Sequence, residues 1–286
     1  MAGRKLNRKK LLLIILLLLA GAAIAAYFYW PDKASDDAVG TNQSQSTASD
    51  QPATQLKTFP VINLQLTVAA WAAKQDGRAS VVVYDFANKK RVASLNPDRQ
   101  YFSASIYKLY VAYIGYQKIA DGTYNGNEPY LSGYSRAECL DAMIRDSYSP
   151  CGEKWWNELG KQNLTEKMKA YGLKNTSLTG LYTSAGDAAI ILQRLFERQD
   201  LTKAHRNAFL DSMKDQPELY RRGLPSGFSE SAVYNKVGWN LQKEWHDTAI
   251  VTLPNGRSYV VTVLSENVGS SQIKALGEAI ESRLNR

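Results

Sequence analysis

The sequence predicts a mixed α/β domain of the α+β type, in which helices flank an antiparallel β-sheet and an all-helical subdomain forms a separate layer. Strand patterns lie near both ends of the globular part, within residues 80–95 and 232–264. The segment between them has the apolar spacing of helices. Strands from the two ends can therefore form one antiparallel sheet that a terminal helix covers, while the middle forms a helical layer.

The first elements of the domain are one helix and two strands. Residues 62–74 have the pattern of an amphipathic helix. Residues 80–86 are apolar and rich in β-branched side chains, and a turn at 87–90 leads back into a second strand at 91–95. These two strands are expected to form a hairpin.

The remaining elements follow in chain order. Helices are expected at residues 105–119, 136–144, 153–159, 164–171 (ended by Gly172), from Thr183 as an N-cap, and at 203–214. Strands are expected at 232–237, 247–253 and 258–264, with a hairpin turn at 254–256, before a final helix at 271–284.

The N-terminal region predicts export. Residues 1–10 form a basic segment, and residues 11–30 carry no charge over about the 20 residues that a membrane-spanning helix needs. Basic residues before this stretch and aromatic residues at its far end favour a single-pass anchor in membrane lipid, with the N-terminus in the cytoplasm. The alternative is secretion after cleavage of a signal peptide near Ala23-Ile24-Ala25, although the apolar stretch exceeds an ordinary signal core.

Composition separates a tether from the globular domain. Residues 31–58 are rich in Ser, Thr, Gln, Asp and Ala and predict a disordered linker, so the domain spans residues 59–286. The net charge is +8, but five of these charges precede residue 11, which leaves +3 for the rest. No nucleic-acid-binding surface is therefore indicated.

The first candidate site is the pair Ser105 and Lys108. Their spacing places both side chains on one face of a helix, and the following residues, Ile106 to Ile114, are apolar almost all round. Serine needs a neighbouring base to act as a nucleophile. Burial disfavours the ammonium form of lysine, so Lys108 could accept that proton. A capping serine beside a surface lysine is the alternative reading of this pair alone.

Cysteine and histidine usage indicates no metal or cofactor. Cys139 and Cys151 lie in the exported part, where a disulfide can form, and two buried thiols are the alternative. The only histidines, His205 and His246, lie far from both cysteines in sequence and are expected to be structural.

Two further motifs follow the Ser105–Lys108 pair in order. Ser147-Tyr148-Ser149 lies in a loop between helices, and Lys236-Val237-Gly238 ends a strand. With these motifs, residues 59–286 resemble the serine β-lactamase and penicillin-binding protein superfamily, in its class A β-lactamase branch, whose motifs are S-x-x-K, S-D-N and K-T-G. The resemblance implies that fold and the formation of an acyl-enzyme.

The resemblance also implies a catalytic role for the matching residues. Ser105 would be the acylated nucleophile, and Lys108 would take its proton. Ser147 would pass a proton to the leaving nitrogen, while Lys236 would hold the substrate carboxylate and tune Ser147. The backbone N–H groups of Ser105 and Trp239 would form the oxyanion hole.

Three substrate-contacting positions complete the implied site, and two depart from the family pattern. Gly238 would let the substrate backbone approach the strand closely. Ser149 stands where an asparagine amide contacts the substrate side chain, and it reaches less far. Val237 replaces the hydroxyl-bearing residue that contacts the substrate carboxylate, so recognition there would depend on Lys236 and the backbone.

A missing carboxylate is the largest departure. Class A β-lactamases carry a glutamate, in the loop before the helix expected at Thr183, that activates water for deacylation. Residues 176–182 contain no acid. Because such a base is typically worth about 10²–10⁴-fold in rate, we expect an acyl-enzyme that forms but hydrolyses slowly.

Three functions fit these observations. The first is a membrane-tethered serine hydrolase that forms an acyl-enzyme with β-lactams. The second is a penicillin-binding D,D-peptidase acting on D-Ala-D-Ala cell-wall peptides. The third is a non-catalytic sensor that binds penicillin or cell wall. In each case we expect a monomer.

Overall fold

The computed structural model describes residues 59–240 and 243–285. The predicted basic segment, anchor and linker all lie outside the described residues. Within the described ranges, no helix has both the length and the apolar character that crossing a membrane requires.

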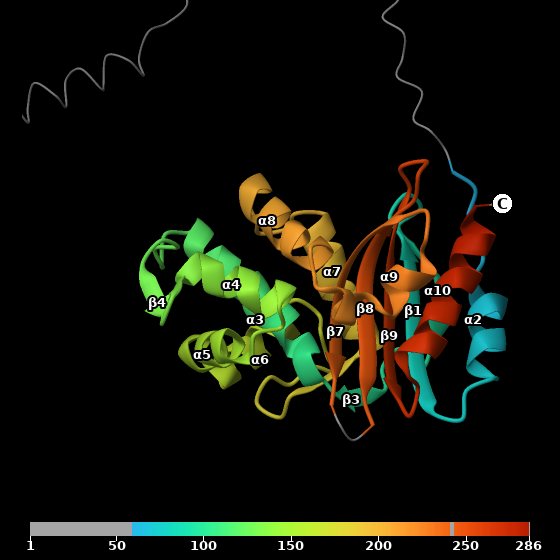
Figure 1. Ribbon diagram of the computed structural model, residues 1–286, viewed down its shortest axis with the longest axis horizontal. Coiled ribbons are helices and arrows are strands. Elements are labelled where there is room, and N and C mark those ends of the chain that lie inside the picture. The colour runs from blue at the N-terminus through green and yellow to red at the C-terminus, as the bar shows by residue number, and fades with distance from the viewer. Residues whose placement is uncertain (1–58, 241–242, 286) are drawn as a thin grey trace, which may run out of the picture. The chain divides into compact units, whose positions relative to one another are not determined.

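A five-stranded antiparallel sheet with strand order β2-β1-β9-β8-β7 forms the centre of the domain (Figure 1). The prediction that both ends of the globular part supply one sheet is confirmed. Strand β1 pairs with β9 along its whole length, from Arg78 opposite Glu266 to Asp85 opposite Tyr259. The strands are β1 (Arg78–Asp85), β2 (Lys90–Leu95), β7 (Ala232–Trp239), β8 (Trp245–Thr252) and β9 (Ser258–Glu266).

Different helices cover the two faces of this sheet (Figure 1). Helices α2 (Gln65–Ala72) and α10 (Ser270–Leu284) cover one face, and the helical layer covers the other. Side chains alternate along a strand, so Val82 packs into the helical layer while Val81 and Val83 pack on the α2 and α10 side. The two hydrophobic cores therefore share the sheet as a common wall.

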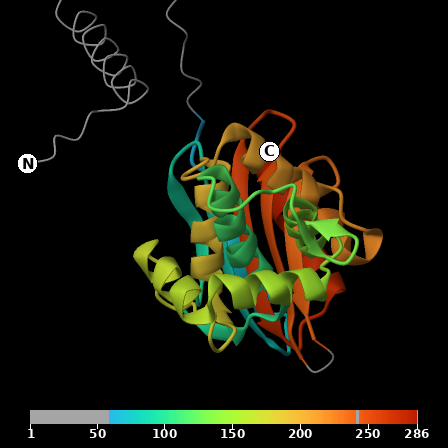
Figure 2. The same cartoon turned by 90° about the vertical axis from the view of Figure 1, so that its left-hand side faces the viewer.

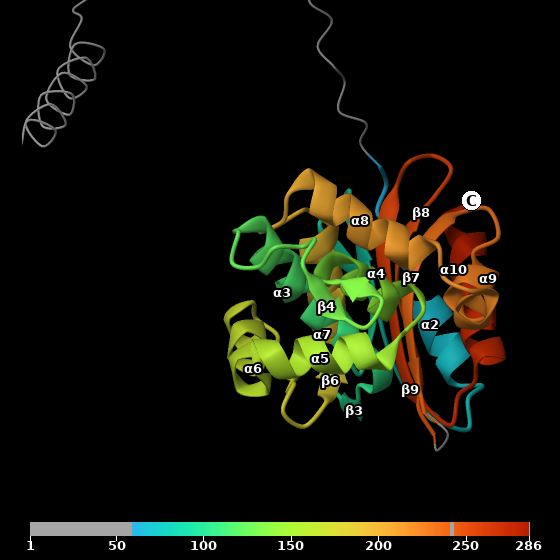
Figure 3. The ribbon, with the colours of Figure 1, turned by 60° about the vertical axis from the view of Figure 1, so that its left-hand side comes forward.

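The helical layer is built around α3 (Tyr107–Ala120), which is buried from Tyr107 to Tyr116 (Figures 2 and 3). A one-turn 3-10 helix, η1 (Ala104–Ile106), leads into it. The other helices of this layer are α4 (Arg136–Arg145), α5 (Ser149–Leu159), α6 (Lys161–Ala170), α7 (Ala185–Phe196) and α8 (Lys203–Lys214). After α8 come the 3-10 helix η2 (Glu218–Arg221) and the short helix α9 (Leu224–Gly227), which packs on α10 on the opposite side of the sheet.

The structure contains two short strand pairs that the sequence pattern does not predict. Strands β3 (Gln100–Phe102) and β6 (Tyr182–Ser184) form one pair, and β4 (Pro129–Leu131) and β5 (Tyr134–Ser135) form another. The prediction of Thr183 as an N-cap was wrong by one residue, because Thr183 pairs with Tyr101 in extended conformation. Ser184 caps α7 instead and accepts a hydrogen bond from the Asp187 N–H at 3.2 Å.

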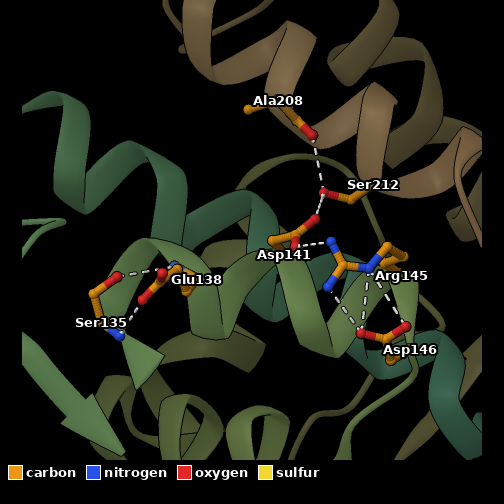
Figure 4. Close-up of polar contacts among 7 residues, drawn as sticks. All are labelled: Ser135, Glu138, Asp141, Arg145, Asp146, Ala208 and Ser212. Atoms are coloured by element: carbon orange, nitrogen blue, oxygen red, sulfur yellow. Dashed lines mark hydrogen bonds and ion pairs between the residues drawn. The ribbon is translucent and has the colours of Figure 1, made fainter. Parts of the chain in front are cut away.

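Helix α4 is fixed at both ends by polar contacts (Figure 4). At its start, the Ser135 hydroxyl accepts from the Glu138 N–H, and the Glu138 carboxylate accepts from the Ser135 N–H, a capping box. Further along, Asp141 accepts from Ser212 of α8 at 2.7 Å and pairs with Arg145. These contacts hold the loop that follows α4 in a defined place.

Candidate active site

The nucleophile candidate lies in a turn held in an uncommon backbone conformation. Ser105 is half-buried in η1, and the preceding residue, Ala104, has a φ of 43°. A non-glycine residue in this left-handed region costs free energy and is found where the surrounding structure fixes it. Here the Ser103 N–H donates to the Leu181 carbonyl at 2.6 Å, and the Ile106 N–H donates to the Ser103 carbonyl at 2.9 Å.

The Lys108 amine is buried and faces the loop between α4 and α5. Its Nζ donates to the Ser147 carbonyl at 2.5 Å and to the Ser149 hydroxyl at 3.1 Å. In the part of the chain described, it makes no hydrogen bond to the Ser105 hydroxyl. Burial lowers the pKa of Lys108 to about 8, and the Glu153 carboxylate opposes this shift.

Ser147 lies between two lysines. The Lys236 amine donates to the Ser147 Oγ at 3.0 Å, and the Lys108 amine lies 3.4 Å from the same oxygen. Ser147 itself has a φ of 52°, which turns the chain sharply between α4 and α5. The three side chains come from three distant parts of the sequence, and the hydroxyl is placed to exchange protons with either amine.

Lys236 is buried on β7, an edge strand of the sheet. Its second hydrogen bond goes to the Val237 carbonyl at 2.9 Å. Burial lowers the pKa of Lys236 well below its ordinary value, and the neighbouring Lys108 lowers it further. Asp247 opposes the shift. Both lysines are thus biased toward the neutral amine that can accept a proton.

A cross-link encloses the Ser147 loop. Cys139 of α4 and Cys151 of α5 form a disulfide, with a Cα–Cα distance of 5.2 Å. In the chain-entropy model, closing a loop of this size stabilises the fold by about 3 kcal/mol. The cross-link restricts the loop that carries Ser147 to one short path between two buried anchor points.

Gly238 is needed for a contact within the protein. A Cβ atom at this position would lie 2.9 Å from the Ser105 nitrogen, which is closer than real Cβ atoms approach, and 3.0 Å from the Ile106 nitrogen, which is tighter than most Cβ contacts. Glycine therefore lets β7 pack directly on the turn that contains Ser105. The resulting proximity brings the Ser105 backbone N–H beside the end of β7, where Trp239 follows.

Of the other three predicted substrate-contacting residues, Ser149 and Trp239 line a cavity and Val237 does not. The cavity has a volume of about 300 Å³ and is also lined by Ser105. The Trp239 ring stacks on Trp245 at 5.0 Å between ring centroids. Val237 is buried and does not line the cavity, so only its backbone is available near the site.

Two buried residues that the sequence did not mark as functional support this arrangement. His246 accepts from the Ser265 N–H through Nδ1 at 3.1 Å, so Nε2 carries the proton and donates to the Phe102 carbonyl at 2.8 Å. Phe102 directly precedes the nucleophile turn. Asp247 accepts from the Leu224 N–H at 2.8 Å and from the Asn235 side chain at 2.9 Å, and burial raises its pKa to about 7.

The loop before α7 supplies no carboxylate to the cavity. Asp187, at the start of α7, points into this loop and accepts from the Asn175 N–H at 2.7 Å and the Thr176 hydroxyl at 2.8 Å. The acid that does line the cavity is Glu153 of α5. In the described ranges, no group of three or more His, Cys, Asp or Glu side chains is placed to hold a metal ion.

Comparison with known families identifies the domain. A family model described as the β-lactamase enzyme family matches residues 63–283, which is most of the chain. The chain belongs to this family. The match runs from before α2 to within one residue of the end of α10 and includes all three motifs.

Solved structures of similar fold agree with the family assignment. PBP-A has 18% sequence identity and a TM-score of 0.71, with 80% of this chain and 99% of that chain covered. An ancestral class A β-lactamase of Gram-negative bacteria has 19% identity and a TM-score of 0.70, covering 77% and 99%. A β-lactamase from Xanthomonas campestris has 19% identity and a TM-score of 0.70, covering 78% and 100%. At these identities the likeness shows the shared fold, and no curated protein sequence matches the chain.

Proposed function

We propose that the domain is a serine hydrolase that is acylated at Ser105 by β-lactams. One observation carries this proposal. Two buried lysines, Lys108 and Lys236, meet at the Ser147 hydroxyl, beside the cavity that holds Ser105. Such a group of proton-accepting and proton-donating side chains is what acyl transfer to serine requires.

The proposed acylation step needs two proton transfers, one from Ser105 to a base and one from an acid to the leaving nitrogen. The Ser105 oxygen attacks the β-lactam carbonyl carbon while its proton passes to neutral Lys108. The backbone N–H groups of Ser105 and Trp239 stabilise the negative charge that develops on the carbonyl oxygen. The C–N bond of the ring then breaks, and Ser147 protonates the nitrogen and is reprotonated by a lysine. The product is an ester on Ser105.

Deacylation is proposed to be slow. It requires a base that removes a proton from the attacking water. The loop before α7, where class A β-lactamases carry that base, holds no acid at residues 176–182, and Asp187 of α7 accepts hydrogen bonds from Asn175 and Thr176 instead. An ester on the same serine could form from a D-Ala-D-Ala peptide, which would leave a peptidyl-D-alanyl group on Ser105 and release D-alanine. A penicillin-binding D,D-peptidase, or a sensor that keeps its acyl group, is therefore the second candidate.

One similar structure supports an ester in this fold. The L158E mutant of PBP-A is an acyl-enzyme complex with penicillin G, and it has 18% identity and a TM-score of 0.69 with this chain. For this chain we also propose an extracytoplasmic location on a membrane tether. That part depends on the uncharged stretch of residues 11–30 and the basic residues before it.

Intact-mass spectrometry of the full chain in detergent, incubated with penicillin G, tests the function. A β-lactam adds its whole mass on ring opening, and the adduct should persist over many minutes. The Ser105→Ala variant should show no adduct. Rapid loss of the adduct with release of hydrolysed penicillin would contradict slow deacylation. A folded wild-type chain that acquires no mass would contradict the proposed function.

A further inference from the structure

Glu153 is the one acid among the described residues that line the cavity with Ser105. It is exposed, and within the described ranges its carboxylate forms neither a hydrogen bond nor an ion pair. A carboxylate without a partner in a substrate cavity is available to a ligand. No motif of the sequence analysis included this residue.

The position of Glu153 on α5 relates it to the substrate. Ser149, Glu153 and Asn157 follow one another at intervals of four residues, so they form a stripe on one face of the helix, and all three line the cavity. The family resemblance places the substrate side arm at Ser149. The stripe therefore continues the path of that arm away from Ser105, with Glu153 one helical turn beyond.

Close packing fixes this stripe. A Cβ atom on the neighbouring Gly152 would lie 3.0 Å from both the Lys108 Cε and the Tyr107 hydroxyl. This turn of α5 therefore packs against the start of α3 with no room to shift inward. The same proximity explains why the Glu153 carboxylate raises the pKa of Lys108 against the effect of burial.

The cationic groups nearby do not neutralise Glu153. The Lys161 amine, which also lines the cavity, lies over the Trp156 ring at 3.8 Å from its centroid. Lys108 and Lys236 are buried and make their hydrogen bonds to neutral oxygens. The side-arm end of the cavity thus presents one unpaired negative charge.

We propose that Glu153 is a specificity residue that favours acyl donors whose side arm carries a positively charged amine. This inference depends on the proposed acylation of Ser105. The amine could belong to an amino-substituted β-lactam or to a diamino acid side chain of a peptide. The two sources share the chemistry that a carboxylate recognises, and the experiment below separates them.

The test compares acylation rate constants of the full chain for three penicillins that differ in side-arm charge. Ampicillin carries an α-amine that is protonated below about pH 7, penicillin G is neutral there, and carbenicillin carries a carboxylate. Glu153→Gln should lower the ratio of the ampicillin to the carbenicillin rate by about threefold to tenfold, as expected for an exposed charge interaction. Added salt should reduce the ratio in the wild type but not in the variant.

The ratio separates charge selection from other effects of the substitution. Removing Glu153 also changes the pKa of Lys108, which alters all three rates together and cancels in the ratio. Glu166→Gln on α6 is the matched control, since Glu166 is exposed, accepts from Gln162 and does not line the cavity. Its ratio should equal that of the wild type.

A peptide pair identifies the source of the amine. Release of D-alanine is measured from acetyl-Lys-D-Ala-D-Ala with its side-chain amine free or acetylated. A preference for the free amine that Glu153→Gln removes assigns the site to a peptide, while an effect with penicillins alone assigns it to the β-lactam arm. Unchanged ratios in both series, with normal acylation by penicillin G, would overturn the role of Glu153. No acylation by any compound would instead overturn the proposed function.

Discussion

The domain buries basic side chains in two regions. In one region the buried cation has a carboxylate partner, and in the other the buried amines have only neutral acceptors within the described ranges. Between β8 and β9, Arg257 pairs with Asp85 of β1 at 2.6 Å, and both side chains are almost completely buried. Arg257 also donates to the Pro60 carbonyl at 3.0 Å. In the candidate site, Lys108 and Lys236 are equally buried but donate only to neutral oxygens among the described residues.

Whether a buried basic side chain has a carboxylate partner indicates whether it has a structural or a chemical role. A buried ion pair keeps both groups ionised and fixes two segments to each other. A buried lysine without a paired carboxylate is pushed toward its neutral form, which costs stability but supplies a base near neutral pH. Arg257 thus has the environment of a structural cation, and the two lysines have the environment of proton-transfer groups.

The largest expected effect comes from Lys108→Met. Methionine fills a similar volume without an amine, so acylation of Ser105 by penicillin G should fall by about 10²–10⁴-fold, the typical contribution of a positioned base. The melting temperature should stay the same or rise, because no buried amine needs to be desolvated. Stopped-flow acylation and thermal unfolding measure the two quantities. A large loss of stability with little change in rate would place Lys108 with Arg257 as a structural residue.

Arg257→Met should show the reverse pattern. It leaves the Asp85 carboxylate buried and unpaired, which typically destabilises a protein by about 3–5 kcal/mol. The acylation rate of the folded fraction should not change. Urea unfolding monitors the free energy of unfolding, and the double variant Asp85→Asn/Arg257→Met should recover part of the loss. A stability equal to the wild type would show that the pair is not what fixes this region.

The pH dependence sharpens the comparison with a smaller effect. The pKa of Lys108 is lowered to about 8, and the base must be neutral to take the Ser105 proton. Acylation should therefore increase by about tenfold per pH unit below this value and level off above it. Because Lys236 titrates nearby, the apparent pKa belongs to the pair. A rate that does not change between pH 6 and pH 9 (about the range that brackets the shifted pKa) would argue against a lysine base.

The sequence predicts the strands of the sheet better than the contacts within the candidate site. The order, spacing and flanking elements of three motifs predict catalytic roles for Ser105, Lys108, Ser147 and Lys236. The structure brings the last three together at the Ser147 hydroxyl. The expected contact between Ser105 and Lys108 assumed one continuous α-helix. In the structure, Ser105 lies in a 3-10 turn before α3. The Lys108 amine donates to the Ser147 carbonyl and the Ser149 hydroxyl instead. Ser147 has a left-handed backbone conformation, which a motif match does not indicate.

Other features depend on contacts between segments far apart in sequence. His246 reaches the Phe102 carbonyl across 144 positions, and a single sequence gives no sign of such a pairing. The need for glycine at position 238 arises from the nucleophile turn, not from substrate alone. Glu153 belongs to no motif, and only the packing of α5 against α3 shows that it lines the cavity.

The Cys139–Cys151 disulfide ties the geometry of the Ser147 turn to the redox state of its surroundings. It spans 12 positions that include the whole turn carrying Ser147. Thiols remain reduced in the cytosol and are oxidised outside it. In the cytosol the two cysteines would therefore stay reduced, and the turn would lack its cross-link. Under the proposed extracytoplasmic location, this turn would be cross-linked only after export.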